Sequence, residues 1–267
     1  MRETVQISSR DNAQLKEARR VRDGKERDKI FIEGARLVGE ALRSGLEIEK
    51  LFLSGEGASR AEGLLEAGII GEVYAVADPA FRSISDTVTS QGVVAIAKRP
   101  TAGKSDLEKR LCTTSVPIVL FLHQTNNPSN LGAVIRTAEA AGAAGLIVSS
   151  GSADAFSPKA LRAAMGSSFR LPVWIDAELG EVLEWAGEKG LQTVATEIGA
   201  TKSYADFDWT RPNLLLLGSE AHGLSNAELQ DVDEKIVIPM EPPVESLNLA
   251  VACGVVLFEA RRQNSLR

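Results

Sequence analysis

In the second half of the chain, short apolar runs alternate with longer segments whose apolar positions recur at helical spacing. Short continuous apolar runs are typical of buried strands, and longer periodic segments are typical of helices. The expected strands are residues 118–122, 145–149, 191–196, 214–217 and 235–238. The expected helices are residues 131–141, 157–165, 179–189 and 246–262. Apolar strands separated by helices indicate an α/β fold with a parallel sheet covered on both faces.

The front of the chain has the same alternation on a smaller scale. The pattern predicts a charged helix from about Asn12, an amphipathic helix over residues 33–44, and strands at residues 48–53, 72–76 and 93–97. Residues 98–117 have no sustained apolar repeat, so we expect a linker with about one helical turn there. The predicted organisation is a small α/β domain over residues 1–98, a linker over 99–116, and a larger domain over 117–267.

Length and composition are those of an ordinary globular protein. With 267 residues, 44% of them hydrophobic and 25% charged, the chain can bury one large core or two modest ones. No apolar run approaches the roughly 20 residues that span a bilayer, so we expect no membrane segment. Cys112 and Cys253 lie far apart, which favours neither a disulfide framework nor a metal site. We therefore expect a metal-free protein in a reducing cytoplasm.

The charge distribution leaves two interpretations open. A net charge of −6 argues mildly against nucleic-acid binding, which depends on Lys and Arg contacts to phosphate. However, basic side chains outnumber acidic ones within residues 1–30, and the chain closes with Arg261, Arg262 and Arg267. The charge pattern alone is equally typical of a solvated helical face.

The first candidate motif is NPSNLGAVIR, residues 127–136, which follows the strand that ends at Leu122. Ligands of open α/β sheets bind at the carboxyl ends of the strands. We expect Asn130 to cap the next helix and Arg136 to lie nearly two turns along it. A capped helix with a surface arginine explains the same residues without any chemistry.

The second motif is LGSEAHGLS, residues 217–225, directly after another strand. Gly218 and Gly223 suit a tight turn or a close approach of the backbone to a ligand, because glycine adopts positive φ without steric cost. An ordinary strand-to-helix turn capped by Ser225 is the alternative. His222 has no metal-ligand spacing to His123, so we interpret it as a loop residue.

The third motif is IPMEPPVESLNLAVA, residues 238–252, in which a Pro-rich loop leads into an almost wholly apolar helix. A helix that is apolar on every side is expected to be buried on every side. Ser246 and Asn248, at its polar start, are expected to face the end of the sheet, where backbone groups are unpaired. A core helix with a polar cap is the simpler interpretation.

Several common catalytic signatures do not occur in the sequence. No G-x-G-x-x-G follows a strand, which argues against a dinucleotide site, and no G-x-x-x-x-G-K-[ST] indicates nucleotide hydrolysis. No Ser-His-Asp or Cys-His set is placed for acyl transfer.

In this order and at this spacing, the three segments resemble motifs 1, 2 and 3 of the SpoU/TrmH family, within the SPOUT class of methyltransferases. The resemblance is close over about residues 117–262. In the front domain, the segments FIEG with RLV (residues 31–38) and SQGVVA (residues 90–95) resemble, more loosely, a ribosomal-protein-like substrate-binding domain of rRNA-modifying members.

The resemblance implies an S-adenosylmethionine-dependent enzyme that methylates a ribose 2′-hydroxyl of RNA, most simply 23S-type ribosomal RNA. It further implies a deep trefoil knot, against the usual rule, and a homodimer with the active site near the interface. The positions that match the family's functional residues are Asn130, Arg136, Glu220, Ser246 and Asn248. The expected cofactor contacts are Thr196, Gly218, Ile238 and Leu247.

The residue types suit this chemistry. A ribose hydroxyl is a poor nucleophile, and transfer from a sulfonium requires it in line with the methyl carbon, so positioning supplies much of the rate. Arg136 can orient a phosphate and favour a developing oxyanion, but guanidinium does not readily give up its proton. Its role as base or electrostatic organiser therefore stays open. We expect Asn130 and Glu220 to fix the arginine and the motif loops, and Ser246 and Asn248 to shape the pocket.

The third motif departs from the family at two places. Ala250 stands where many relatives have a serine, which excludes a mechanism through that hydroxyl, and Pro242-Pro243 replace a loop where glycine is frequent.

Two other functions are compatible with the sequence. One alternative is a noncatalytic RNA-binding or ribosome-assembly protein. The other is an enzyme of the same class that methylates tRNA or a base.

Overall fold

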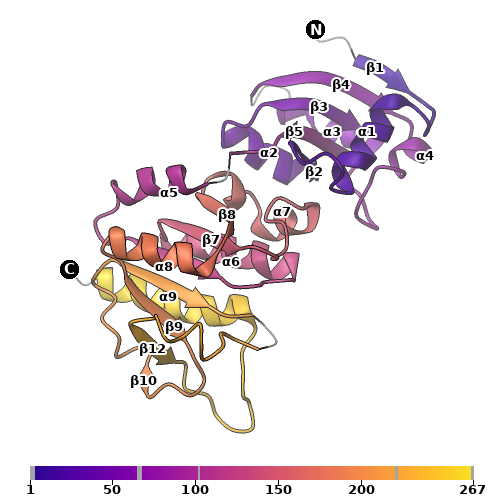
Figure 1. Ribbon diagram of the computed structural model, residues 1–267. Helices are drawn as coiled ribbons and strands as arrows, with labels where there is room; N and C mark the ends of the chain where they lie inside the picture. Colours follow the sequence, from indigo (N-terminus) through magenta and orange to yellow (C-terminus); the bar gives the residue numbers. More distant parts are fainter. Residues whose placement is uncertain (1–3, 65–67, 102, 220–221, 266–267) are drawn as a thin grey trace. The chain divides into compact units, whose positions relative to one another are not determined.

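The computed structural model in Figure 1 describes residues 4–64, 68–101, 103–219 and 222–265. The chain forms two compact units. The first comprises Met1–Thr101 with Phe156–Phe169, and the second comprises Ala102–Ala155 with Arg170–Arg267. Each unit has its own sheet and is described by itself.

The first unit is built on a mixed five-stranded sheet with the order β1-β4-β3-β5-β2. Its strands are β1 (Thr4–Ile7), β2 (Lys29–Glu33), β3 (Ile48–Leu53), β4 (Ile70–Val76) and β5 (Val93–Lys98). Its helices are α1 (Ala13–Arg22), α2 (Ala35–Arg43), α3 (Gly55–Arg60), α4 (Asp78–Phe81) and α7 (Pro158–Ala164). Residues of α1 and α4 pack with residues of the strands in one buried cluster.

Most expected elements of this unit are present, but β1 and β2 were not predicted. Residues 48–53 form a strand with the predicted bounds, and Asn12 caps α1 by accepting from the backbone of Gln14 at 2.8 Å. Glu33 was expected to begin a helix and instead ends β2. The reason is Gly34, whose φ of 103° separates β2 from α2, a conformation that glycine adopts readily.

The second unit is built on a seven-stranded sheet with the order β10-β12-β9-β11-β6-β7-β8. Its strands are β6 (Ile118–Leu122), β7 (Gly145–Ser149), β8 (Val173–Ala177), β9 (Gln192–Thr196), β10 (Lys202–Ser203), β11 (Asn213–Leu217) and β12 (Glu234–Val237). All the neighbouring strands pair in parallel. The expected parallel α/β architecture is confirmed, while β8 and β10 were not predicted.

The helices of this unit are α5 (Lys104–Leu111), α6 (Pro128–Ala141), α8 (Leu179–Glu188) and α9 (Leu249–Ser265). Helix α9 packs along α6, with Gly254 close to Thr137. A Cβ atom at Gly254 would lie 3.5 Å from Cγ2 of Thr137, which is ordinary van der Waals contact. The C-terminal helix therefore returns to the helix that follows β6.

Helix α5 lies in the segment that was expected to be a linker. Leu107 is fully buried in the core of the second unit, and Glu108 accepts a hydrogen bond from Nε1 of Trp185 at 3.1 Å. The linker interpretation is therefore wrong for this part of the segment. The helix is short, and its buried face consists mainly of Leu107 and Leu111, which is too little to produce a sustained periodicity.

Helix α9 is more exposed than the sequence predicted. Val251 and Phe258 are 52% and 50% exposed, so the prediction that this helix is buried on every side is wrong for the single chain. One side of α9 packs inward through Cys253, Val256 and Leu257. Because Val251 and Phe258 are apolar and exposed, part of the remaining surface of the helix is apolar. None of the described helices, α9 included, is long and apolar enough to cross a membrane.

Candidate active site

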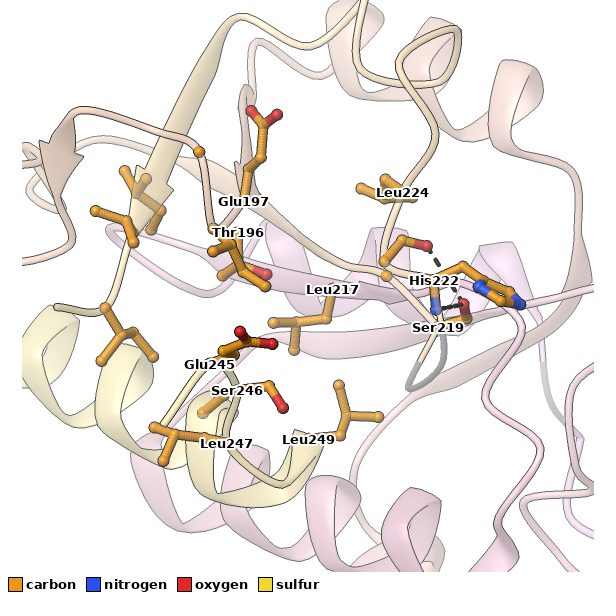
Figure 2. Close-up of a pocket in the computed structure, with 18 of the residues that line it drawn as sticks. Thr196, Glu197, Leu217, Ser219, His222, Leu224, Glu245, Ser246, Leu247 and Leu249 are labelled. Carbon is orange, nitrogen blue, oxygen red and sulfur yellow. Dashed lines mark hydrogen bonds between the residues drawn. The ribbon is translucent and has the colours of Figure 1, made fainter. Parts of the chain in front are cut away.

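A cavity of about 770 Å³ lies in the second unit, where β9, β11 and β12 end and α9 begins (Figure 2). Its lining comes from the segments that follow β9 and β11, from the loop that joins β12 to α9, from the start of α9 and from one position of α6. The size is typical of a small-molecule site, and the place is where open α/β sheets bind ligands. Seven predicted site residues line it: Asn130, Thr196, Gly218, Ile238, Ser246, Leu247 and Asn248.

Asn130 lines the cavity, but it does not cap α6 as expected. The helix begins earlier, at Pro128, and its cap is Asn127, whose Oδ1 accepts from the backbone of Ser129 at 2.9 Å. Asn130 therefore lies within the first turn, where its side chain faces the loop before α9. Its Oδ1 accepts a hydrogen bond from Nδ2 of Asn248 at 3.2 Å.

Arg136 is exposed on α6 and is not among the lining residues. It lies six residues beyond Asn130, which corresponds to about 9 Å along a helix. No hydrogen bond or ion pair joins Arg136 to any residue that the structure describes. The structure thus places this side chain on the surface, close in sequence to the cavity but outside its lining.

The second motif forms a tight turn at the end of β11. The backbones of Ser219 and Gly223 exchange two hydrogen bonds, of 3.2 and 2.9 Å, and Gly223 has a φ of 64°. A Cβ atom at Gly218 would lie 2.3 Å from the carbonyl carbon of Gly223. Of the two interpretations, the structure shows the tight turn, in which the backbone of Gly218 lies close to that of Gly223. Glu220 lies outside the described residues.

The segment after this turn is tied to the end of β6 by a carboxylate and an imidazole. Nε2 of His123 lies 2.9 Å from Oε1 of Glu228, and Oε2 of Glu228 accepts from both the backbone and the hydroxyl of Ser225 at 2.7 Å. Burial alone would raise the pKa of Glu228, but the Ser225 bonds and the charge of His123 hold the pKa below its usual value. Ser225 thus caps a turn in this segment rather than a helix.

In the third motif, one side chain performs two tasks. Oδ1 of Asn248 accepts from the backbone of Ala250 at 2.9 Å, which caps the start of α9. Its Nδ2 donates to Asn130, which joins the third motif to the first. Ser246 and Leu247 precede it and line the cavity, as the labelled side chains in Figure 2 show.

Three titratable residues line the cavity that the sequence did not single out as site residues: Glu197, His222 and Glu245. Glu197 directly follows Thr196, and its Oε2 lies 3.8 Å from Nζ of Lys235. His222, interpreted as an ordinary loop residue, belongs to the lining. The signal available in the sequence was adjacency, because Glu197 and Glu245 each neighbour a predicted site residue.

The lining could hold an organic molecule with an apolar part and a positive charge. Leu217, Ile236 and Ile238 offer apolar walls, and Glu197 and Glu245 offer carboxylates. Within the part of the chain that the structure describes, no group of three His, Cys, Asp or Glu side chains is placed to hold a metal ion. The apolar walls together with a few polar groups are typical of a small-molecule site.

The fold and the site define a two-part α/β protein with a small-molecule cavity at the strand ends of its parallel sheet. Residues 117–258 match the SpoU rRNA Methylase family, and residues 12–95 match the MRM3-like substrate binding domain. The chain belongs to the SpoU rRNA methylase family. The family resemblance and the expected class of enzyme, an RNA methyltransferase, are confirmed.

Similar proteins extend over almost the whole chain. The 23S rRNA (guanosine(2553)-2′-O)-methyltransferase RlmP of Bacillus subtilis is 32% identical over 96% of this chain and 99% of its own. The structure of the SpoU methyltransferase AviRb from Streptomyces viridochromogenes in complex with AdoMet has a TM-score of 0.84, with 30% identity over 95% of this chain and 98% of that one. An AdoMet-bound rRNA methyltransferase from Sinorhizobium meliloti has a TM-score of 0.82, with 30% identity over 97% and 98%.

Proposed function

We propose that the protein transfers a methyl group from S-adenosylmethionine to a ribose 2′-hydroxyl of ribosomal RNA, of the 23S type. The observation that carries the proposal is the convergence of three separate motifs in one cavity. Asn130, Gly218 and Ser246 come from different segments of the chain and line the same space, and Asn248 joins two of these segments by a hydrogen bond. The relatives named as 23S rRNA 2′-O-methyltransferases support the substrate class.

The cavity fits the cofactor in size and in chemistry. A volume of about 770 Å³ is ample for a nucleoside with an amino-acid tail. Thr196, Ile238 and Leu247 line it together with Gly218, whose lack of a side chain lets the turn of the second motif close. When bound, S-adenosylmethionine supplies an electrophilic methyl group on a sulfonium. The residues of the cavity have the task of holding that group still and excluding water.

Arg136 is proposed to position the RNA. It is exposed, and no carboxylate of the described residues neutralises it, so it can take a phosphate or a developing oxyanion from the RNA by two parallel hydrogen bonds. Because it lies outside the lining of the cavity, we propose that the bound RNA and a second copy of the chain complete the site around it. Asn130, Ser246 and Asn248 then hold the first and third motifs in position.

The second copy is proposed to cover the apolar surface of α9. Val244, Leu247, Val251 and Phe258 are 54%, 38%, 52% and 50% exposed in the single chain. Val251 and Phe258 are seven residues apart, so they lie on the same side of the helix. Exposed apolar surface of this kind marks an interaction site. A homodimer through α9 would place this contact beside Leu247, a residue of the cavity.

The chain after β12 is proposed to form the trefoil knot of the family. In the sheet, β12 lies between β9 and β10, whereas the next element, α9, packs on α6, the helix that follows β6 in the chain. The connecting residues 238–248 therefore pass back across the ends of β9 and β11, where they line the cavity. In this arrangement the segments that cross to form the knot are also the segments that line the cavity.

The first unit is proposed to bind the RNA substrate in the cytoplasm. The match to the MRM3-like substrate binding domain over residues 12–95 supports this role. Specific recognition of RNA commonly uses loops and single-stranded regions, which suits a separate binding domain attached to a methyltransferase domain.

The test is methyl transfer to defined RNA. The purified protein is incubated with tritiated-methyl S-adenosylmethionine and unmodified 23S rRNA, and the product nucleosides are separated and identified by mass spectrometry. We expect a labelled 2′-O-methyl nucleoside. Label in a base would contradict the proposed ribose 2′-hydroxyl as the acceptor, and label in tRNA alone would contradict rRNA as the substrate. Cofactor binding without any transfer would favour a noncatalytic RNA-binding protein.

A further inference from the structure

The charged side chains of the cavity have one sign. Among the described residues that line it, Glu197 and Glu245 are the carboxylates, and the lining contains neither lysine nor arginine. A cavity with this lining attracts a positively charged ligand and repels a negatively charged one. The question is which carboxylate acts on the ligand.

The two carboxylates have different surroundings. Glu197 has a neighbouring cation, since its Oε2 lies 3.8 Å from Nζ of Lys235, and Figure 2 shows its side chain extending away from Glu245 and Ser246. Glu245 has no ion pair or side-chain hydrogen bond with any residue that the structure describes. In Figure 2 its carboxylate is turned inward, toward Leu217. Glu245 thus presents an uncompensated negative charge to the cavity.

We propose that Glu245 recognises the positive charge of the cofactor and thereby favours the sulfonium-bearing S-adenosylmethionine over the product, which has no sulfonium and no net charge. This inference rests on the proposed function. S-adenosylmethionine carries a sulfonium, an ammonium and a carboxylate, and hence a net positive charge, whereas S-adenosylhomocysteine has lost the sulfonium charge. A carboxylate in a partly enclosed site attracts the charged form more strongly than the neutral form.

The consequence is an attraction that weakens once the methyl group has been transferred. Before transfer, Glu245 holds the charged cofactor in the cavity. After transfer the sulfur is neutral, the attraction at that atom is lost, and the product leaves more readily. Glu245 is exposed and has no cation beside it among the described residues, so its carboxylate is available to a positively charged ligand.

The test compares three ligands by isothermal titration calorimetry with the full-length protein. S-adenosylmethionine has both positive groups, S-adenosylhomocysteine has only the ammonium, and 5′-methylthioadenosine has neither. Glu245→Gln removes the charge and keeps the shape. The matched control is Glu241→Gln, which makes the same change in the same exposed loop at a residue outside the cavity lining.

We expect Glu245→Gln to weaken S-adenosylmethionine binding about tenfold, in line with the loss of one charge-assisted contact, and to change 5′-methylthioadenosine binding less than about twofold. S-adenosylhomocysteine then identifies the group that Glu245 contacts. A smaller loss than for S-adenosylmethionine indicates the sulfonium and supports the proposal in full. An equal loss indicates the ammonium, which keeps charge recognition and overturns the preference for the cofactor over the product.

Equal losses for all three ligands, no loss for any of them, or the same losses in Glu241→Gln would overturn the inference while leaving the proposed function in place. A wild-type protein that binds neither S-adenosylmethionine nor S-adenosylhomocysteine would overturn the proposed function and the inference with it. Circular dichroism of each variant establishes that the fold is retained.

Discussion

The side chain of Asn248 donates a hydrogen bond to the side chain of Asn130 at 3.2 Å, although the two residues are 118 positions apart in the chain. The same side chain caps α9 through its oxygen. Because its oxygen accepts from the backbone, its nitrogen remains as the donor for Asn130. One residue thus fixes the start of the C-terminal helix and attaches it to the first motif.

Removal of this hydrogen bond is expected to weaken the fold and the cavity together. Asn248→Ala should lower the free energy of unfolding by about 1 kcal/mol, since it removes a helix cap. Asn248→Asp keeps the cap oxygen and loses the donor, so it should be the milder of the two. A double-mutant cycle with Asn130→Ala, followed by urea denaturation, should give a coupling of about 0.5–1 kcal/mol. Additive effects would show that the contact contributes nothing.

Arg136→Ala is expected to lower methyl transfer at least about 100-fold, the usual cost of removing a donor that stabilises a developing charge. Binding of S-adenosylmethionine and the unfolding midpoint should stay close to wild type, because the side chain is exposed and outside the cavity lining. Arg211→Ala, also exposed and in the same unit, is the control and should transfer methyl normally. Wild-type transfer by Arg136→Ala would remove this residue from the mechanism.

Gly218→Ala is expected to weaken cofactor binding by about tenfold or more, because the new Cβ would meet the backbone of Gly223 at 2.3 Å and force the turn apart. Gly180→Ala, in α8 with open space around the added atom, should bind like wild type and gain stability from better helix propensity. Calorimetric titration with S-adenosylmethionine measures both. Unchanged affinity in Gly218→Ala would mean that the turn does not shape the cavity.

Phe258→Asp is expected to convert the proposed dimer to a monomer, since a charge would replace an aromatic ring in the apolar contact. The dissociation constant, measured by analytical ultracentrifugation, should rise at least about 100-fold. Val88→Asp places the same charge at another exposed apolar position, in the first unit, and should leave association unchanged. A monomeric wild-type protein would contradict the homodimer directly.

The lowered pKa of Glu228 predicts how stability depends on pH. A carboxylate whose pKa is lowered by folding contributes stability above its unfolded pKa, and that contribution is lost as the pH falls through its folded pKa. Glu228→Gln should therefore lower the free energy of unfolding at about pH 7, by about 1 kcal/mol, and approach wild type toward about pH 3.

His123→Asn removes the electrostatic contribution of the imidazole to this lowered pKa and leaves the Ser225 bonds, so its effect should be smaller than that of Glu228→Gln. Urea denaturation across the acid range distinguishes the variants. A constant difference between Glu228→Gln and wild type at every pH would show that the carboxylate is not stabilised by the fold.

Local pattern was sufficient for much of the second unit. Residues 118–122 and 145–149 form strands with the predicted bounds, because buried parallel strands are apolar throughout and stand out from their surroundings. Pattern was insufficient where an element is short or weakly apolar. The strands β1 and β10 and the helix α5 were not predicted, because each is stabilised by its neighbours rather than by its own periodicity.

Which residues meet at the site was partly determined by sequence. The order of the three motifs selected Asn130, Gly218 and Ser246, and the fold brings all of them to one cavity. Glu245 lies in the third motif beside Ser246, but only the structure shows that its side chain lines the cavity. The contact between His123 and Glu228 joins residues across the ends of two strands, and local spacing does not encode such a contact.

The sequence by itself determined the alternation of strands and helices, the family motifs and the residue types available for chemistry. These follow from local propensity and from burial, which each segment expresses in its own composition. Only the tertiary structure decided that Asn248 bonds to Asn130, that Arg136 lies outside the cavity and that one side of α9 stays exposed. Those outcomes depend on how the chain returns from β12 to α6, and packing between distant segments sets that path.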